Sequence, residues 1–297
     1  SCVYCYQNKN EKLMTTEVAN MIIEKIDRIL NDNIFEGINI HYFGGEPLLN
    51  IPVLIYLDEN IKKITDKIGI VYKAFLTTNG SMLSKELLQK VKFSSIQLTF
   101  DGLEKTHDRL RVSDHFHFKE EIELIENIMN FSQAKVLLRT NICKENKDEI
   151  IALHKYIFEK FGNERIEINP NRTIKYHQDD SFEMLSVQEY AEVAYQIKLL
   201  WSEQKGKFEL PVPRSTPCKF PYGNAYAISP EGYCTFCSGS MDQEKKYFFD
   251  VDIENKKMFS VRKECKKCNI LPLCLGGCII QYNLRAGACT YEKYELK

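Results

Sequence analysis

Strand-like and helix-like segments alternate through the first 170 residues, and this alternation constrains the fold more than any other feature. Helix-like stretches, in which apolar residues recur every three or four positions, separate five segments rich in β-branched and aromatic residues. Those five segments cover residues 38–43, 70–78, 95–100, 134–141 and 165–170. Strands that alternate with helices form right-handed βαβ units, in which the strands run parallel. The pattern therefore predicts an α/β fold built on a parallel sheet.

Each of the first four strand-like segments ends in a short polar sequence. In chain order these are GGEP, TTNG, TFDG and RTN. Any one of them is an ordinary turn signal. In parallel α/β folds, however, ligands bind at the carboxyl ends of the strands, which all lie at one edge of the sheet. We therefore expect the four sequences to line one pocket.

The charge balance gives no indication of a nucleic-acid or membrane partner. Forty Lys and Arg residues stand against 41 Asp and Glu residues, so the net charge is -1 at pH 7. Apolar runs such as residues 51–57 are far shorter than the roughly 20 apolar residues of a membrane-spanning helix. We expect neither nucleic acid nor a membrane among the partners.

Cysteine usage is unusual for a chain of 297 residues. The total of 11 is odd, and the eight cysteines from Cys218 to Cys289 all lie in the last 80 residues. Disulfide frameworks are typical of short secreted chains with an even number of cysteines. The pattern instead favours metal thiolates in a reducing compartment, so we expect a cytoplasmic protein. Because the composition changes near Pro211, we expect a domain at residues 1–170, a helical connector at 171–210 and a Cys-rich domain at 211–297.

The C-terminal cysteines have the spacing of metal ligands. They read C-x₁₃-G-x₄-C from Cys218 to Cys237, then C-x₂-C-x₅-C-x₃-C from Cys265 to Cys278, followed by Cys289. Eight thiolates are enough for two centres with four cysteine ligands each. Spacing alone leaves two alternatives open, structural zinc sites and [4Fe–4S] clusters.

The first residues, S-C-V-Y-C, carry a second cysteine pattern. Taken with the C-terminal pattern, it resembles the radical S-adenosylmethionine (SAM) enzymes that have a C-terminal SPASM domain, a module that holds auxiliary iron–sulfur clusters. In this family a C-x₃-C-x₂-C motif holds one [4Fe–4S] cluster, and the residue before the third cysteine is usually aromatic. Cys2, Tyr4 and Cys5 match the second cysteine, the aromatic residue and the third cysteine. We expect the first cysteine and the first barrel strand to lie upstream of Ser1.

The resemblance extends through the strand-end sequences. It implies a partial (β/α)6 TIM-like barrel that lacks its first strand, followed by a small SPASM domain. GGEP resembles the motif that holds the amino end of SAM, TTNG a motif that lines the SAM pocket, and LTFDG an S-x-D-G element with threonine in place of serine. RTN resembles a strand end whose arginine contacts the SAM carboxylate, and DGLEKTHDRLR matches a D-G-x₄-H-D-x₂-R stretch. The SAM-binding residues that the resemblance implies are Tyr4, Gly44, Gly45, Glu46, Thr78, Asn79, Thr99, Asp101 and Arg139.

The resemblance also implies how the cysteines are divided among up to three [4Fe–4S] clusters. Cys2 and Cys5 would bind the cluster that cleaves SAM. Two auxiliary clusters would be held by the C-terminal cysteines, the outer one by Cys265, Cys268, Cys274 and Cys289, and the inner one by Cys218, Cys237, Cys278 and, as fourth ligand, Cys234. The remaining Cys143 is expected to be a buried structural thiol.

The function implied is that of a peptide maturase. Such an enzyme generates a 5′-deoxyadenosyl radical and modifies a ribosomally made peptide by a thioether or carbon–carbon crosslink, or by epimerisation. The expected partners are a peptide or protein substrate and an electron donor such as flavodoxin or ferredoxin, and an upstream leader-binding domain is possible in this class. Two alternatives are a sulfatase maturase that forms formylglycine and a non-catalytic zinc or iron–sulfur module. The sequence identifies no catalytic acid or base.

Overall fold

The computed structural model describes most of the first 206 residues and shorter parts of the remainder. The described residues are 2–5, 12–162, 164–175, 181–206, 213, 215, 225–235, 246–248, 261–278, 289–290 and 292–295.

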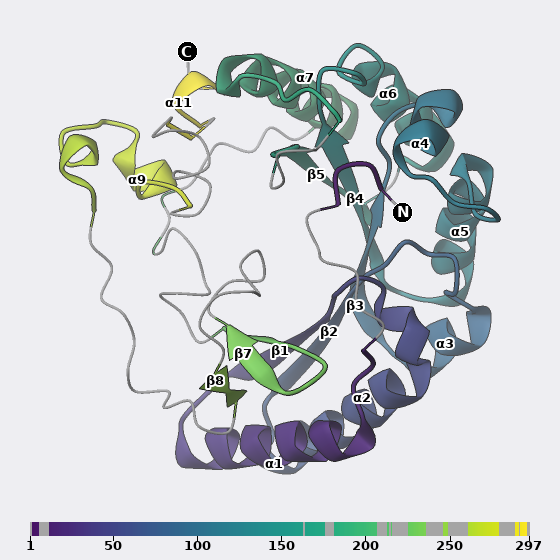
Figure 1. Ribbon diagram of the computed structural model, residues 1–297, viewed down its shortest axis with the longest axis vertical. Helices are drawn as coiled ribbons and strands as arrows, with labels where there is room; N and C mark the ends of the chain where they lie inside the picture. The colour runs from purple at the N-terminus through teal and green to yellow at the C-terminus, as the bar shows by residue number, and fades with distance from the viewer. Residues whose placement is uncertain are drawn as a thin grey trace.

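A five-stranded parallel sheet forms the centre of the molecule, which confirms the predicted architecture. Its strand order follows the chain, β1-β2-β3-β4-β5, and every neighbouring pair is parallel. The strands are β1 (Gly37–Tyr42), β2 (Val71–Thr77), β3 (Phe93–Thr99), β4 (Lys135–Ile142) and β5 (Ile166–Arg172). Figure 1 shows the strands on the inner side of an arc, as in a partial barrel.

Helices cover the outer side of this arc (Figure 1). They are α1 (Thr16–Asp32), the 3₁₀ helix η1 (Pro47–Asn50), α2 (Ile51–Ile68), α3 (Lys85–Lys90), α4 (Glu104–Leu110), α5 (Phe118–Phe131), α6 (Ile150–Phe161) and α7 (Val187–Lys205). No helix is predicted from the sequence over residues 104–110, because Leu110 is the one apolar residue of α4 and no helical period can be read there.

Local sequence accounts for the ends of several helices. The hydroxyl of Thr15 accepts a hydrogen bond from the Val18 amide and so caps α1. Ser186 and Glu189 form a capping box at the start of α7, each side chain bonding the other's backbone amide. Helix α2 ends at Gly69, whose φ of 81° is in the left-handed region that glycine adopts without strain.

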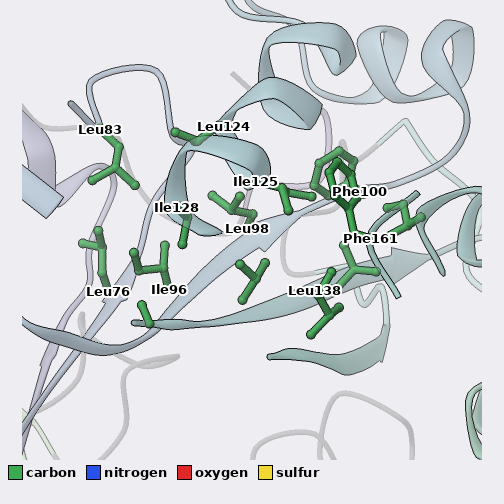
Figure 2. Close-up of a cluster of buried hydrophobic side chains, with 14 of the residues drawn as sticks. Leu76, Leu83, Ile96, Leu98, Phe100, Leu124, Ile125, Ile128, Leu138 and Phe161 are labelled. Carbon is green, nitrogen blue, oxygen red and sulfur yellow. The ribbon is translucent and has the colours of Figure 1, made fainter. Parts of the chain in front are cut away.

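The main core lies between the sheet and the outer helices. Figure 2 shows Leu76, Ile96, Leu98 and Leu138 from the strands facing apolar residues of α5, such as Ile125. Each of these side chains is at most 1% exposed. Because successive strand residues point to opposite faces, the intervening residues lie on the inner, concave face of the sheet. That face is therefore the one available to ligands.

The described C-terminal residues form small elements. They are the antiparallel strands β6 (Ala227–Ile228), β7 (Tyr233–Thr235) and β8 (Lys246–Tyr247), the 3₁₀ helix η3 (Lys263–Cys265), and the short helices α9 (Leu271–Cys274) and α11 (Glu292–Glu295). Cys234 of β7 and Phe248 pack against Ile22 and Ile26 of α1. Helix α11 contacts α7, and α9 lies at the open side of the arc (Figure 1). The expected boundary near residue 210 falls outside the described residues, so the three-part division stays a prediction. Within the described part of the chain, no helix combines the length and the apolar character that crossing a membrane requires.

Candidate active site

The N-terminal loop that carries Cys2 and Cys5 is attached to the residues that follow α4. Cys2 forms an isolated antiparallel bridge with Arg111, and the Val3 amide donates to the Leu110 carbonyl at 3.0 Å. The Cys5 amide donates to the Cys2 carbonyl at 3.3 Å, which turns the loop back on itself. The two thiols of the C-x₂-C sequence are therefore held close to the barrel.

Tyr4 connects this loop to the ends of β3 and β4. Its hydroxyl donates a short hydrogen bond to Asp101 Oδ2 and accepts one from Asn141 Nδ2 at 3.2 Å. Arg111 Nη1 lies 3.5 Å from the same hydroxyl. The tyrosine ring packs edge-on against Phe182, with 6.3 Å between ring centroids. Cys2 and Cys5 thereby lie at the carboxyl edge of the sheet, where the sequence predicts the pocket.

Burial dominates the electrostatics around this loop. It raises the pKa of the Cys2 thiol and of the Asp101 carboxyl, while the Arg111 guanidinium opposes both shifts. It also raises the pKa of Tyr4 well above the ordinary value, helped by the negative charge of Asp101. Tyr4 is therefore a neutral hydrogen-bond donor near neutral pH.

The GGEP and TTNG sequences meet at one carboxylate. Glu46 Oε1 accepts from the Leu48 amide at 3.0 Å and from Thr78 Oγ1 at 2.7 Å, and Oε2 accepts from the Asn79 amide at 2.7 Å. Gly80 ends the second sequence with a φ of 87°, and a Cβ there would lie 2.5 Å from Leu124 Cδ2. The structure thus joins the ends of β1 and β2 through residues that the sequence predicts as SAM-binding, with Gly44 and Gly45 immediately before the carboxylate.

Arg139 and Thr99, predicted from the next two strand ends, are neighbours in the β3–β4 register. Arg139 Nε donates to Asn141 Oδ1 at 2.9 Å. Asn141 also donates its backbone amide to Asp101 Oδ1 at 2.7 Å. Arg139, Asn141, Asp101 and Tyr4 are thus linked in one hydrogen-bonded group at the ends of β3 and β4.

Polar side chains that the sequence reasoning missed lie across the strands of the sheet. His41 Nε2 lies 2.8 Å from Thr77 Oγ1, and burial lowers the pKa of this histidine. Asn169 Nδ2 donates to Gln97 Oε1 at 3.1 Å, and Asn171 Nδ2 donates to Asn169 Oδ1 at 2.9 Å. Their signal in the sequence is strand alternation, which places polar residues on the face opposite the core. The group offers neutral hydrogen-bond donors and acceptors to a ligand.

Four C-terminal cysteines line one cavity, and they are the four expected to hold the outer auxiliary cluster. These residues are Cys265, Cys268, Cys274 and Cys289. Arg262 Nη2 lies 3.8 Å from Cys265 Sγ, Lys293 Nζ lies 3.9 Å from Cys289 Sγ, and the Gly276 amide lies 3.4 Å from Cys274 Sγ. Cations and N–H groups beside sulfur stabilise thiolates. The donor set and its surroundings fit an anionic iron–sulfur cluster.

Four cysteine thiolates are the usual ligands of both structural zinc ions and [4Fe–4S] clusters. The zinc and iron–sulfur alternatives of the sequence analysis therefore both remain for this set of residues, and the metal content of the protein decides between them.

The inner auxiliary cluster is described only in part. Cys218 and Cys237, two of its expected ligands, lie outside the described residues. Cys234 is 2% exposed on β7, within the apolar cluster against α1. Cys278 is partly buried beyond α9. The ligand set of this cluster therefore stays a prediction, whereas Cys143 is buried as expected.

The chain matches one protein-family model and is similar in sequence to known proteins. A model of the radical SAM superfamily matches residues 1–157. The chain is 33% identical over 108 residues to the uncharacterized protein MJ0907 of Methanocaldococcus jannaschii, covering 35% of each protein, so it spans about a third of that relative. It is 24% identical over 328 residues to the radical SAM cyclopropyl synthase TigE of Paramaledivibacter caminithermalis, covering 98% of this chain and 67% of TigE.

Solved structures share the fold. Native anSMEcpe with bound AdoMet (SAM) has a TM-score of 0.73 at 18% identity, over 99% of this chain and 90% of that one. Its complex with AdoMet and the Cp18Cys peptide has a TM-score of 0.76 over the same shares. SuiB of Streptococcus suis bound to S-adenosylmethionine has a TM-score of 0.59 at 17% identity, over 98% of this chain and 70% of SuiB. At these identities the agreement concerns the fold.

Proposed function

The chain belongs to the radical SAM superfamily, and we propose that it is a peptide maturase of that superfamily. Enzymes of this superfamily use a [4Fe–4S] cluster and SAM. The proposed reaction removes a hydrogen atom from a ribosomally made peptide and leads to a thioether or carbon–carbon crosslink, or to epimerisation. The observation that carries the proposal is the attachment of the Cys2–Cys5 loop, through Tyr4, to the ends of β3 and β4, whose sequences resemble SAM-binding motifs.

In this proposal the first two strand ends bind the methionine part of SAM. Gly44 and Gly45 present their backbone to its amino group, and Glu46 fixes that backbone because Thr78 and the Asn79 amide hold its carboxylate. Preorganised hydrogen bonds of this kind position a ligand without further loss of entropy.

The third and fourth strand ends complete the SAM pocket. Thr99 retains the hydroxyl that the S-x-D-G element supplies and is proposed to contact the ribose or the carboxylate. Arg139 is proposed to pair with the SAM carboxylate, with its Nε fixed by Asn141. Cys2 and Cys5 hold the cluster, and Tyr4 packs beside the adenine. When bound, cluster and SAM supply a 5′-deoxyadenosyl radical, which takes hydrogen from C–H bonds that acid–base groups cannot activate.

The linked polar side chains of the strands support a peptide substrate. Gln97 and Asn169 present amide groups, which match the donors and acceptors of a peptide backbone, while His41 and Thr77 add further neutral polar groups. One of the solved structures of anSMEcpe holds both AdoMet and the Cp18Cys peptide. We propose that the substrate lies along this face, beneath SAM.

The C-terminal cysteines are proposed to hold auxiliary clusters near the substrate. Cys265, Cys268, Cys274 and Cys289 hold the outer cluster, and Arg262 and Lys293 offset its negative charge. Cys218, Cys234, Cys237 and Cys278 are proposed for the inner cluster. Such clusters are suited to receive an electron from the substrate, and a flavodoxin or ferredoxin is the proposed external donor.

The metal content of the protein tests this proposal first. The protein is expressed from its complete reading frame, purified without oxygen, and analysed for iron, acid-labile sulfide and zinc. We expect about twelve irons with equal sulfide per chain, as three [4Fe–4S] clusters require. About two zinc ions and no sulfide would indicate the non-catalytic zinc module instead.

The substrate class is tested by product analysis. After reduction we expect cleavage of SAM to 5′-deoxyadenosine. Incubation with short peptides encoded beside the gene should give a crosslinked or epimerised product, seen by mass spectrometry and chiral amino-acid analysis. Formylglycine formed on a sulfatase peptide, with the neighbouring peptides left unchanged, would instead identify a sulfatase maturase.

A further inference from the structure

Ionisable side chains are buried between the Cys2–Cys5 loop and helix α5. The side chains of Asp101, Glu121 and His107 are 0%, 1% and 3% exposed, and that of Arg111 is 13% exposed. Burying charges is costly unless they are paired. A cluster of this kind therefore requires a reason beyond stability.

Arg111 lies between the two buried carboxylates. Its Nη1 is 4.0 Å from Asp101 Oδ2, and its Nη2 is 3.8 Å from Glu121 Oε1. Neither oxygen of Glu121 has a hydrogen bond of good geometry in the described part of the protein, so its contact with Arg111 is electrostatic. Burial raises the pKa of Glu121 to about 8. Burial acts to lower the pKa of Arg111, but the neighbouring Tyr4, Glu121, Cys2 and Asp101 together raise it well above its ordinary value. The Arg111 guanidinium therefore lies between two acidic side chains, Asp101 at the end of β3 and Glu121 on α5.

His107 holds this arrangement from the side of α4. The Asp101 amide donates to His107 Nδ1 at 3.5 Å, so the ring proton is on Nε2, which lies 3.2 Å from Glu121 Oε2. Burial lowers the pKa of His107 to about 3, and the ring is therefore neutral. Asp101, His107 and Glu121 accordingly connect the end of β3, helix α4 and helix α5.

The carboxylate of Asp101 has no side left open to a ligand. Asn141 donates its amide to Oδ1 at 2.7 Å, Tyr4 donates its hydroxyl to Oδ2, and Arg111 lies beside Oδ2. The residue is 0% exposed. Its carbonyl oxygen also accepts from Asn146 Nδ2 at 2.8 Å. The groups that occupy Asp101 belong to the protein itself, including the loop that bears Cys2 and Cys5.

We propose that Asp101 and Arg111 are positioning residues of the cluster loop. They hold Tyr4 and the backbone of Cys2, and thereby fix the direction of the two thiolates, instead of contacting SAM. The inference rests on the proposed function, because it takes Cys2 and Cys5 as cluster ligands. It assigns to the Asp and Arg of the D-G-x₄-H-D-x₂-R stretch a different task from that of Thr99 and Arg139.

Hydrogen exchange of the loop tests this assignment in the cluster-loaded protein. The variants are Tyr4→Phe, Asp101→Asn and Arg111→Gln. Each variant removes one buried interaction of the loop. The free energy of local opening should then fall by the contribution of about one hydrogen bond, so we expect the Val3 amide to exchange roughly tenfold faster. Arg111→Lys keeps the charge and should restore part of the protection. Exchange at the wild-type rate in all three variants would overturn the proposal.

Two surface substitutions serve as controls. Tyr56→Phe removes an exposed hydroxyl that bonds Asn20, and Arg109→Lys alters an exposed ion pair with Glu145 two residues before Arg111. Both should leave exchange of the loop unchanged, since exposed pairs contribute little.

Spectroscopy of the reduced cluster separates positioning from SAM binding. If Asp101 positions the cluster loop, Asp101→Asn should change the orientation of the Cys2 and Cys5 thiolates. The electron paramagnetic resonance spectrum recorded without SAM should then differ from that of the wild type. A direct SAM contact predicts a wild-type spectrum without SAM and a weakened response when SAM is added; that result would overturn the proposal. If the wild-type protein holds no cluster at all, the proposed function fails, whereas the same exchange experiment on the cluster-free protein still decides whether these residues hold the loop.

Discussion

Buried His154 predicts a specific pH dependence of stability. The ring is 0% exposed, its Nδ1 accepts from Trp201 Nε1 at 3.0 Å, and its Nε2 lies 3.2 Å from Thr140 Oγ1. A second proton would have to go on Nδ1, where it would oppose the Trp201 donor. Burial lowers the pKa of His154 to about 3. The folded protein thus keeps this ring neutral while the unfolded chain protonates it near the ordinary value of about 6.5.

The sign and the size of the effect follow from linkage. Between about pH 6.5 and pH 3 the unfolded state binds a proton at His154 that the folded state does not, so the free energy of unfolding falls as the pH falls. From pH 7 to pH 5 this amounts to about 2 kcal/mol, at about 1.4 kcal/mol per pH unit below 6.5. Buried Glu121, with its raised pKa, acts in the opposite direction between about pH 4.5 and 8. The difference between wild type and a His154 variant isolates the histidine.

Urea unfolding followed by fluorescence measures this difference. Trp201 is the chain's single tryptophan and touches His154, so its emission reports on the region concerned. In His154→Gln, which keeps one acceptor and one donor, the loss of stability from pH 7 to pH 5 should be smaller than in wild type by about 2 kcal/mol. Exposed His115 supplies the control, since His115→Gln should retain the wild-type slope. Equal slopes in His154→Gln and wild type would refute the reasoning.

Three further predictions concern the site itself. Glu46→Gln should lower the rate of reductive SAM cleavage about tenfold or more, because it weakens charge-assisted hydrogen bonds to Thr78 and Asn79; exposed Glu59→Gln should not. Cys265→Ser should reduce the iron content by about four per chain, whereas Cys143→Ala should leave it unchanged, as iron analysis of purified protein would reveal. Gln97→Ala should raise KM for the peptide roughly tenfold with SAM cleavage retained, and an unchanged KM would argue against peptide binding on that face.

Strand–helix alternation predicted the sheet because its signal is local. Strands such as residues 95–100 carry apolar residues on the core face, so period and order together define parallel βαβ units. Helix α4 was not predicted, because Leu110 is the one apolar residue in its segment and no helical period can be read there. Cys265, Cys268, Cys274 and Cys289, which the resemblance implies as the outer ligand set, line one cavity, and their role as cluster ligands stays a prediction.

Contacts between distant positions were beyond sequence reasoning. Tyr4 and Asp101 are 97 positions apart, and nothing in either local sequence indicates their hydrogen bond. Amide pairs such as Gln97 and Asn169 depend on strand register, which the sequence leaves undetermined until the sheet is assembled. Glu121 in α5 reads as one acidic residue among several, and only packing reveals that it is buried.

The strand ends therefore divide into two kinds, which explains why similar polar sequences need not do similar work. Glu46 and its partners fix a backbone that we propose to bind SAM, whereas Asp101 is enclosed by groups of the protein itself. A radical enzyme needs both, because a ligand must be bound and the cluster loop must be held against a pocket that contains reactive species. A buried Arg111 that lies between Asp101 and Glu121 and beside Tyr4 is suited to the second task, since moving Arg111 or Asp101 leaves the other charge without its ionic partner in the interior. Because an unpaired buried charge is costly in free energy, the loop is held in the one position that keeps these groups paired.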